Sequence, residues 1–128
     1  MKDINEYDIK DVSQVLYMAF EDSLPDIKPK TELKFPLVIW NTNRKESQIF
    51  CSKVFPALLV KIEVERWHTY CYLVGKNGQR LLMVSYIDDG IVWAVFTEES
   101  LKQEKPEDWD ELPLEEIKAK FFNPANWE

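Results

Sequence analysis

All three glycines of this chain lie in one stretch, Val64–Thr97, and each marks a turn between runs of apolar residues. Asn77-Gly78 and Asp89-Gly90 are dipeptides that tolerate positive φ, which the tight turns of β-hairpins require. The runs between them are rich in β-branched and aromatic residues, which favour strands. The stretch is therefore predicted to be a three-stranded antiparallel meander.

Both faces of this meander are apolar. On its second strand Leu81, Met83 and Ile87 alternate with Leu82, Val84 and Tyr86, and on its third Trp93 and Val95 alternate with Val92, Ala94 and Phe96. A sheet exposed to water on one side would instead alternate with polar residues. Each face must therefore be covered: one by a helix near the N-terminus, the other by the C-terminal segment, by closure into a barrel, or by a second subunit.

The chain before the meander predicts one helix and several strands. Apolar residues at helical spacing predict an amphipathic helix over residues 9–21, and two prolines then indicate a surface loop at Ser23–Lys34. Leu37–Trp40 and Ser47–Cys51 are predicted as short strands, and Ala57–Val64 as a longer one that bends or ends near Arg66.

The chain after the meander predicts two helices. Thr97 is expected to cap a short helix over residues 98–104, and Pro113 to occupy the first position of a last helix. Glu116 and Lys120 are spaced to pair along that helix, and Trp127 is expected to fold back onto the body.

Together these elements predict a single α+β domain spanning residues 1–128. A curved, mainly antiparallel sheet of about five strands carries helices near both termini, with the acidic segment 98–128 packed on or beside it. A partly closed small β-barrel with flanking helices is the alternative.

The charge distribution limits the classes of partner. The formal net charge is -7, and residues 98–128 hold 10 acidic and 4 basic residues, so six of the seven net charges lie there. Binding to nucleic acid or to an anionic membrane needs a basic field, so neither is expected. The acidic segment suits a basic protein partner, or it serves solubility alone.

The expected cellular location is inferred from the absence of a membrane span and of a secretory signal, and from the cysteine content. No apolar run approaches the ~20 residues of a membrane span, and the N-terminal residues contain no apolar core of a secretory signal. Two cysteines, Cys51 and Cys71, predict reduced, buried thiols and a cytoplasmic protein.

The residues that could act in catalysis or bind a cofactor or metal form no catalytic motif. The glycine positions fit neither a dinucleotide-binding nor a P-loop pattern, so no cofactor is expected. His68 and Cys71, three residues apart on a strand, point to opposite faces, so no zinc site with Cys51 is expected. Glu63 and Glu65 share a strand face and are expected at a solvated edge. No residue is assigned a catalytic role, and the sequence favours a non-enzymatic protein over an enzyme.

Two candidate sites remain. Trp109 lies among acidic residues, and tryptophan is enriched at interface hot spots while acidic rims steer basic partners. The predicted partner-binding residues are Glu107, Asp108, Trp109, Asp110 and Glu111. Alternatively, Trp109 covers the open face of the sheet. The second candidate is a pocket lined by His68, Tyr70, Tyr72 and Tyr86.

From Tyr70 onward the chain resembles an uncharacterised bacterial domain family of unknown function. The resemblance is carried by the Gly78–Leu82 strand, the turn Asp88-Asp89-Gly90, the aromatic third strand, the short helix with glutamates and the late Asn123-Pro124. It covers under half of the chain and implies no activity, cofactor or site residue.

The hypothesis for function is a non-enzymatic, acidic protein-binding module, such as an inhibitor or immunity-type protein for a basic partner. The alternatives are a small-molecule binder or small enzyme with a pocket around His68, and a structural subunit or homodimer joined through the second sheet face.

Overall fold

The computed structural model describes residues 16–20, 32–36, 38–40, 44–66, 68–86, 92–102 and 113–127. The strands are β1 (Leu16–Ala19), β2 (Glu32–Leu33), β3 (Val38–Trp40), β4 (Ala57–Val64), β5 (His68–Val74), β6 (Arg80–Tyr86) and β7 (Val92–Phe96). The helices are α1 (Arg44–Val54), α2 (Glu98–Lys102), α3 (Leu114–Phe121) and the 3₁₀ helix η6 (Pro124–Trp127). The α+β fold predicted from the sequence is confirmed.

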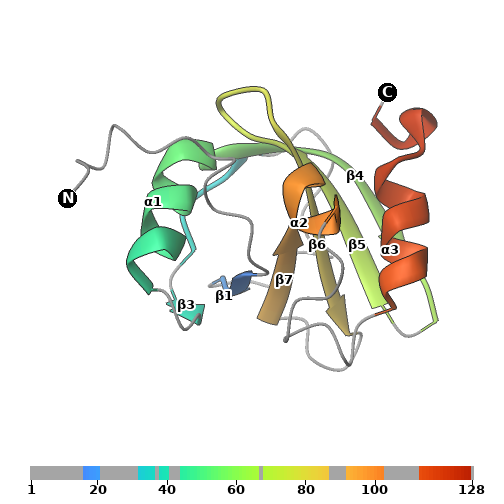
Figure 1. Ribbon diagram of the computed structural model, residues 1–128, viewed down its shortest axis with the longest axis horizontal. Coiled ribbons are helices and arrows are strands. Elements are labelled where there is room, and N and C mark those ends of the chain that lie inside the picture. Colours follow the sequence, from blue (N-terminus) through green and yellow to red (C-terminus); the bar gives the residue numbers. More distant parts are fainter. Residues whose placement is uncertain are drawn as a thin grey trace.

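The described strands form one curled sheet in the order β2-β4-β5-β6-β7-β1-β3, in which every pair is antiparallel (Figure 1). The predicted meander is its centre, since β5, β6 and β7 follow one another both in the chain and in space. The sheet has seven strands rather than about five, because β1 and β2 join it from segments that were predicted as a helix and a loop; β3 lies within the predicted strand Leu37–Trp40.

The hairpin turn between β5 and β6 has the predicted chemistry. Gly78 has φ +86°, a conformation that glycine adopts without steric cost. The amide of Gly75 donates to the carbonyl of Gln79 at 2.8 Å, and a Cβ at Gly75 would lie 3.2 Å from that of Val54 in α1. The turn is thus both tight and packed against a helix. The second predicted turn, Asp88-Asp89-Gly90, lies outside the described residues.

Both apolar faces of the sheet are covered, by different helices. One face carries Cys71, Leu73, Leu81, Met83, Trp93 and Val95 and packs against Phe50, Cys51 and Val54 of α1. The other carries Tyr70, Tyr72, Leu82, Val84, Ala94 and Phe96 and packs against Leu101 of α2 and Ile117 and Phe121 of α3. Figure 1 shows α1 and α3 on opposite sides of the sheet. The alternation of faces predicted for β6 and β7 is confirmed for the side chains described there.

The sequence prediction is wrong in three segments of the first half of the chain. The helix predicted over residues 9–21 is a strand at Leu16–Ala19, where Leu16 and Met18 are buried with the period of two that a strand requires. Backbone pairing with both β3 and β7 stabilises this strand. Residues 9–15 and 21 lie outside the described residues.

The strand predicted at Ser47–Cys51 is part of helix α1. Ser47, Phe50, Cys51 and Val54 are all buried, and their spacing of three and four residues is that of one helix face. Helix α1 therefore covers the sheet face that the sequence assigned to a helix at residues 9–21.

The loop predicted at Ser23–Lys34 contains strand β2, whose Leu33 is buried.

The C-terminal elements follow the prediction closely. Thr97 caps α2: its Oγ1 accepts from the Ser100 amide at 3.1 Å, while Ser100 Oγ accepts from the Thr97 amide at 2.8 Å. Pro113 precedes α3 as its N-cap residue rather than occupying its first turn. Trp127 folds back, and its ring meets that of Tyr72 edge to face at 5.2 Å between centroids.

Candidate functional site

The acidic residues predicted to bind a partner, Glu107, Asp108, Trp109, Asp110 and Glu111, lie outside the described residues. The segments on either side of them are described. Leu101 in α2 and Ile117 in α3 are buried in the same core cluster on one face of the sheet. The described residues before and after the acidic segment therefore pack on the same face of the sheet.

The residues of the alternative pocket lie on two neighbouring strands. Tyr70 and Tyr72 of β5 are fully buried in the core cluster beneath α3, and His68 is half-buried with its ring 6.1 Å from that of Tyr70. Tyr86 pairs with His68 across β5 and β6, and its side chain is outside the described set. A pocket around His68 stays a prediction.

An irregularity in β4 decides which side chains face α3. Leu59 pairs with Leu73, but Lys61 rather than Val60 pairs with Tyr72, so one extra residue is inserted into β4. Such a bulge changes which face the following residues occupy. Lys61 consequently shares the face of Tyr72, and by the same register Glu63 shares the face of Tyr70.

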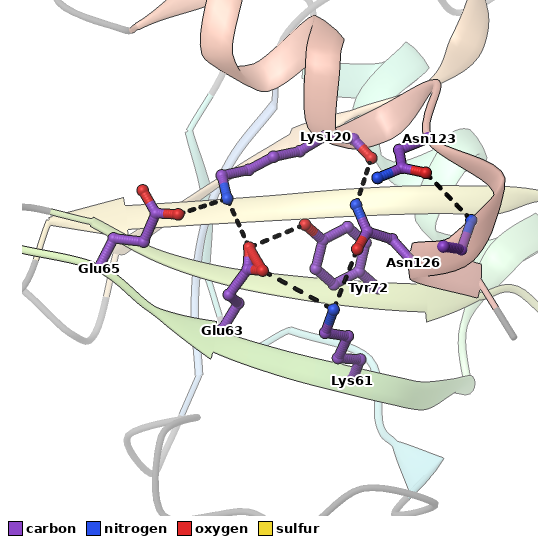
Figure 2. Close-up of polar contacts among 8 residues, drawn as sticks. Lys61, Glu63, Glu65, Tyr72, Lys120, Asn123 and Asn126 are labelled. Carbon is purple, nitrogen blue, oxygen red and sulfur yellow. Dashed lines mark hydrogen bonds and ion pairs between the residues drawn. The ribbon is translucent and has the colours of Figure 1, made fainter.

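Lys120 of α3 joins these strand residues in what we call the lysine network: Lys61, Glu63, Glu65 and Lys120. The Lys120 ammonium group donates to Glu63 Oε1 and to Glu65 Oε1, each at 2.5 Å (Figure 2). It also lies 4.6 Å from the centre of the Tyr70 ring, a favourable cation–π position. Lys61 completes the network, with its ammonium group 3.7 Å from Glu63 Oε2.

Polar contacts then fix the C-terminal end of the chain over the same strands. Lys61 donates to Asn126 Oδ1 at 3.0 Å, and Asn126 Nδ2 donates to the Lys120 carbonyl at 2.9 Å (Figure 2). The Tyr72 hydroxyl donates to Glu63 Oε1 at 3.2 Å. These bonds tie α3, η6 and β4 together beside the lysine network.

A second carboxyl contact lies at the outer end of this network. The side chains of Glu65, just after β4, and Glu116, in the first turn of α3, lie within hydrogen-bonding reach of each other. This contact lowers the pKa of Glu65, with help from Lys120, and raises the pKa of Glu116, with help from desolvation. We call Glu65 and Glu116 the carboxylate pair.

Tyr70 and His68 border the carboxylate pair. Burial raises the pKa of Tyr70, and the nearby Glu116 and Glu65 carboxylates raise it further. Its hydroxyl is buried, and the acceptor beside it is the Glu116 carboxyl group. Burial lowers the pKa of His68, and Glu65 opposes that shift.

The lysine network was only partly foreseeable from the sequence. Glu63 and Glu65 were expected at a solvated edge, but their side chains are 28% and 38% exposed and both bind Lys120. Lys120 acts favourably on the charge of Glu116, as the helical spacing predicted, but its ammonium group donates its hydrogen bonds to Glu63 and Glu65. In the sequence, the position of Lys120 beside the apolar face of α3 was an indication that this lysine lies near the sheet. No feature of the sequence indicated the bulge in β4.

Neither cysteine belongs to this site. Cys51 and Cys71 are buried on the opposite face of the sheet, and burial raises the pKa of each thiol to about 12. Within the described ranges, no cluster of three or more histidine, cysteine, aspartate or glutamate side chains is arranged to hold a metal ion. None of the described helices is long and apolar enough to cross a membrane.

Comparison with known proteins gave no match: no family model, curated protein or solved structure is significantly similar to this chain.

Proposed function

We propose that this protein is a non-enzymatic protein-binding module whose acidic C-terminal part binds a basic protein partner, as an inhibitor or immunity-type protein does. One observation supports the proposal most: the carboxylate pair lies where α3 begins, with the Glu116 side chain exposed and that of Glu65 38% exposed. Within the lysine network and the carboxylate pair, three carboxyl groups face two ammonium groups. When all five groups are ionised, they carry one more negative charge than positive charge.

In the sequence, the predicted partner-binding residues come shortly before α3. Residues 107–111 contribute four acidic side chains around Trp109 and are separated from Pro113 by a single leucine, Leu112. Glu115 and Glu116 follow in the first turn of α3, so the acidic sequence leads directly to the carboxylate pair. Aromatic anchors surrounded by charge are typical of interfaces that steer an oppositely charged partner.

Affinity purification from the native source tests this proposal. Tagged wild-type protein, Trp109→Ala and the control Phe35→Ala are compared, since Phe35 is an exposed aromatic residue between β2 and β3. Circular dichroism verifies that each variant is folded, and mass spectrometry identifies captured proteins. We expect a basic protein to be captured by the wild type and by Phe35→Ala but not by Trp109→Ala.

Two outcomes of this experiment contradict parts of the proposal. A folded Trp109→Ala variant that retains every partner removes the site assignment. Capture that does not weaken with added salt removes the electrostatic part, because salt screens exposed charges. Sedimentation of the purified protein separates either result from self-association, since a chain that remains monomeric at high concentration is not a homodimer.

The environment of His68 favours a second candidate, a small-molecule binder or small enzyme. The imidazole is half-buried, its pKa is lowered by burial, and Glu65 and Tyr70 are neighbours. A neutral imidazole beside a carboxylate is suited to accepting a proton or a hydrogen bond. A fragment screen followed by NMR is expected to perturb the signals of His68 first; fragments that leave these signals unchanged eliminate this candidate.

A further inference from the structure

The second half of β4 forms an open edge of the sheet. Within the described residues, β2 pairs only with Ala57 and Leu58, and no strand lies beside the rest of β4 on the side away from β5. The side chains reflect this difference: those of β5 are mostly buried, whereas residues 60–63 of β4 are half-buried and Val64 is 62% exposed. Helices cover both faces of the sheet, so a further strand would join it at this edge.

The backbone of Ile62 presents its hydrogen-bonding groups to the open side. The amide of Glu65 donates to the carbonyl of His68 at 2.8 Å, toward β5. The direction of bonding alternates along an antiparallel strand, so Glu63 also bonds toward β5 and Ile62 points the other way. An amide and a carbonyl on an open strand edge are a template for another strand. The regular part of this edge begins after the bulge, at Lys61.

We propose that two copies of this chain associate through β4, in antiparallel register about a two-fold axis at Ile62. In this register Ile62 of each copy pairs with its equivalent, and Lys61 of each copy faces Glu63 of the other. Opposite charges stabilise a cross-strand pair and like charges destabilise it. A register centred on Lys61 or on Glu63 would set like charges face to face, so charge complementarity selects the register at Ile62. Such a self-complementary patch is what a two-fold interface requires.

The side chains of Lys61 and Glu63 can contact a second copy without leaving their own network. Both lie on the face of α3, and they are 42% and 28% exposed (Figure 2). Lys61 donates one hydrogen bond to Asn126 and lies 3.7 Å from Glu63, and an ammonium group has three donors. A two-fold axis perpendicular to the sheet keeps this face on the same side in both copies. The inference is independent of the proposed function, because it involves none of the predicted partner-binding residues.

Disulfide trapping tests the proposal. The full-length variant Ile62→Cys is compared with the control Val64→Cys, whose position is more exposed, by oxidation with diamide and non-reducing electrophoresis. Residues paired across two strands have Cα atoms about 5.5 Å apart, which a disulfide spans. The two Val64 positions would be four residues out of register, roughly 13 Å apart. We therefore expect Ile62→Cys to form a covalent dimer about tenfold faster than Val64→Cys.

Charge reversal tests the register. In the Ile62→Cys background, Lys61→Glu places like charges at both cross-strand pairs. The control Lys76→Glu makes the same change in net charge at an exposed residue of the turn between β5 and β6. We expect Lys61→Glu to slow trapping about tenfold and Lys76→Glu to slow it less than about twofold. Circular dichroism of the reduced variants verifies that each is folded.

Sedimentation of the wild type and of Lys61→Glu checks the interface without an introduced cysteine. We expect a dimer that forms at high concentration in the wild type and is weakened by Lys61→Glu. Three results overturn the interface: equal trapping of Ile62→Cys and Val64→Cys, equal slowing by Lys61→Glu and Lys76→Glu, and a wild type that sediments only as a monomer at high concentration. Each of them contradicts the proposal on its own.

Discussion

Replacing Lys120 by methionine is the most direct test of how the lysine network holds α3 on the sheet. Methionine retains an unbranched apolar stem of similar length and removes only the ammonium group. The substitution leaves Glu63 and Glu65 without the cation that both contact at 2.5 Å. The two carboxylates then repel each other, while the Lys61 ammonium group stays beside Glu63.

The expected magnitude follows from the burial of these groups. Removing one partner of a fully buried ion pair costs about 3–5 kcal/mol, because an uncompensated charge stays buried. Here the side chains of Glu63 and Glu65 are 28% and 38% exposed, so water stabilises the remaining carboxylates in part. We therefore expect a loss of about 2 kcal/mol in the free energy of unfolding at pH 7, and a Tm lower by roughly 6–10 °C.

Urea unfolding followed by tryptophan fluorescence measures this loss. Lys118→Met is the matched control, because Lys118 lies in the same last turn of α3 and shares any effect of the helix dipole. Adding Glu63→Gln to Lys120→Met should recover part of the loss, since it removes one of the stranded charges. If Lys120→Met costs no more than Lys118→Met, the network does not stabilise the fold and the reasoning is refuted.

The pH dependence supplies a second check of the same prediction. The pKa of Glu65 is lowered, so its contribution is present above the ordinary value of 4.5 and is lost as pH falls through its folded-state pKa. Burial disfavours the charged form of Lys120, but hydrogen bonds to Glu63 and Glu65 outweigh it and raise its pKa. That contribution is present below 10.5 and is lost as pH rises through the folded-state value. The difference between wild type and Lys120→Met should therefore be largest between these limits and shrink in acid.

Three further predictions concern the rest of the fold. Trp127→Ala removes an edge-to-face contact with Phe121 at 5.4 Å and an indole hydrogen bond to its carbonyl at 2.8 Å, and should cost about 2 kcal/mol in urea unfolding, with Trp127→Phe losing less. Thr97→Ala removes the cap of α2 and should cost about 1 kcal/mol by thermal unfolding, while Thr97→Ser should be nearly neutral. Cys51 and Cys71 should resist a thiol reagent in the native protein at pH 8 and react after denaturation, because their pKa values are raised to about 12 by burial; rapid native labelling would contradict this placement.

Most of the correct predictions came from residues with a local preference for strands, turns or helix caps. The dipeptide Asn77-Gly78 specifies its hairpin locally, and alternating apolar residues in β6 and β7 specify two buried faces whatever covers them. The cap at Thr97 is equally local, since it involves only the backbone and side chains of residues 97 and 100. Such features need no knowledge of distant parts of the chain.

Two of the three errors in the first half of the chain have a common cause. The apolar residues around Leu16 fit both a helical period and a period of two, and pairing with β3 and β7 decided in favour of a strand. Ser47–Cys51 was too short to distinguish a strand from one turn of a buried helix, and packing against the sheet decided in favour of α1. In both places tertiary contacts outweighed weak local preference.

By itself, the sequence determined the meander, the two apolar faces of the sheet and the acidic C-terminal part that motivates a basic partner. Only the tertiary structure decided which helix covers each face, and it alone brought Lys120 to Glu63 and Glu65 and placed Glu116 beside Glu65. The physical reason is that turns and side-chain periodicity act over a few residues. The lysine network instead depends on a bulge in β4 and on the docking of a helix more than fifty residues later in the chain.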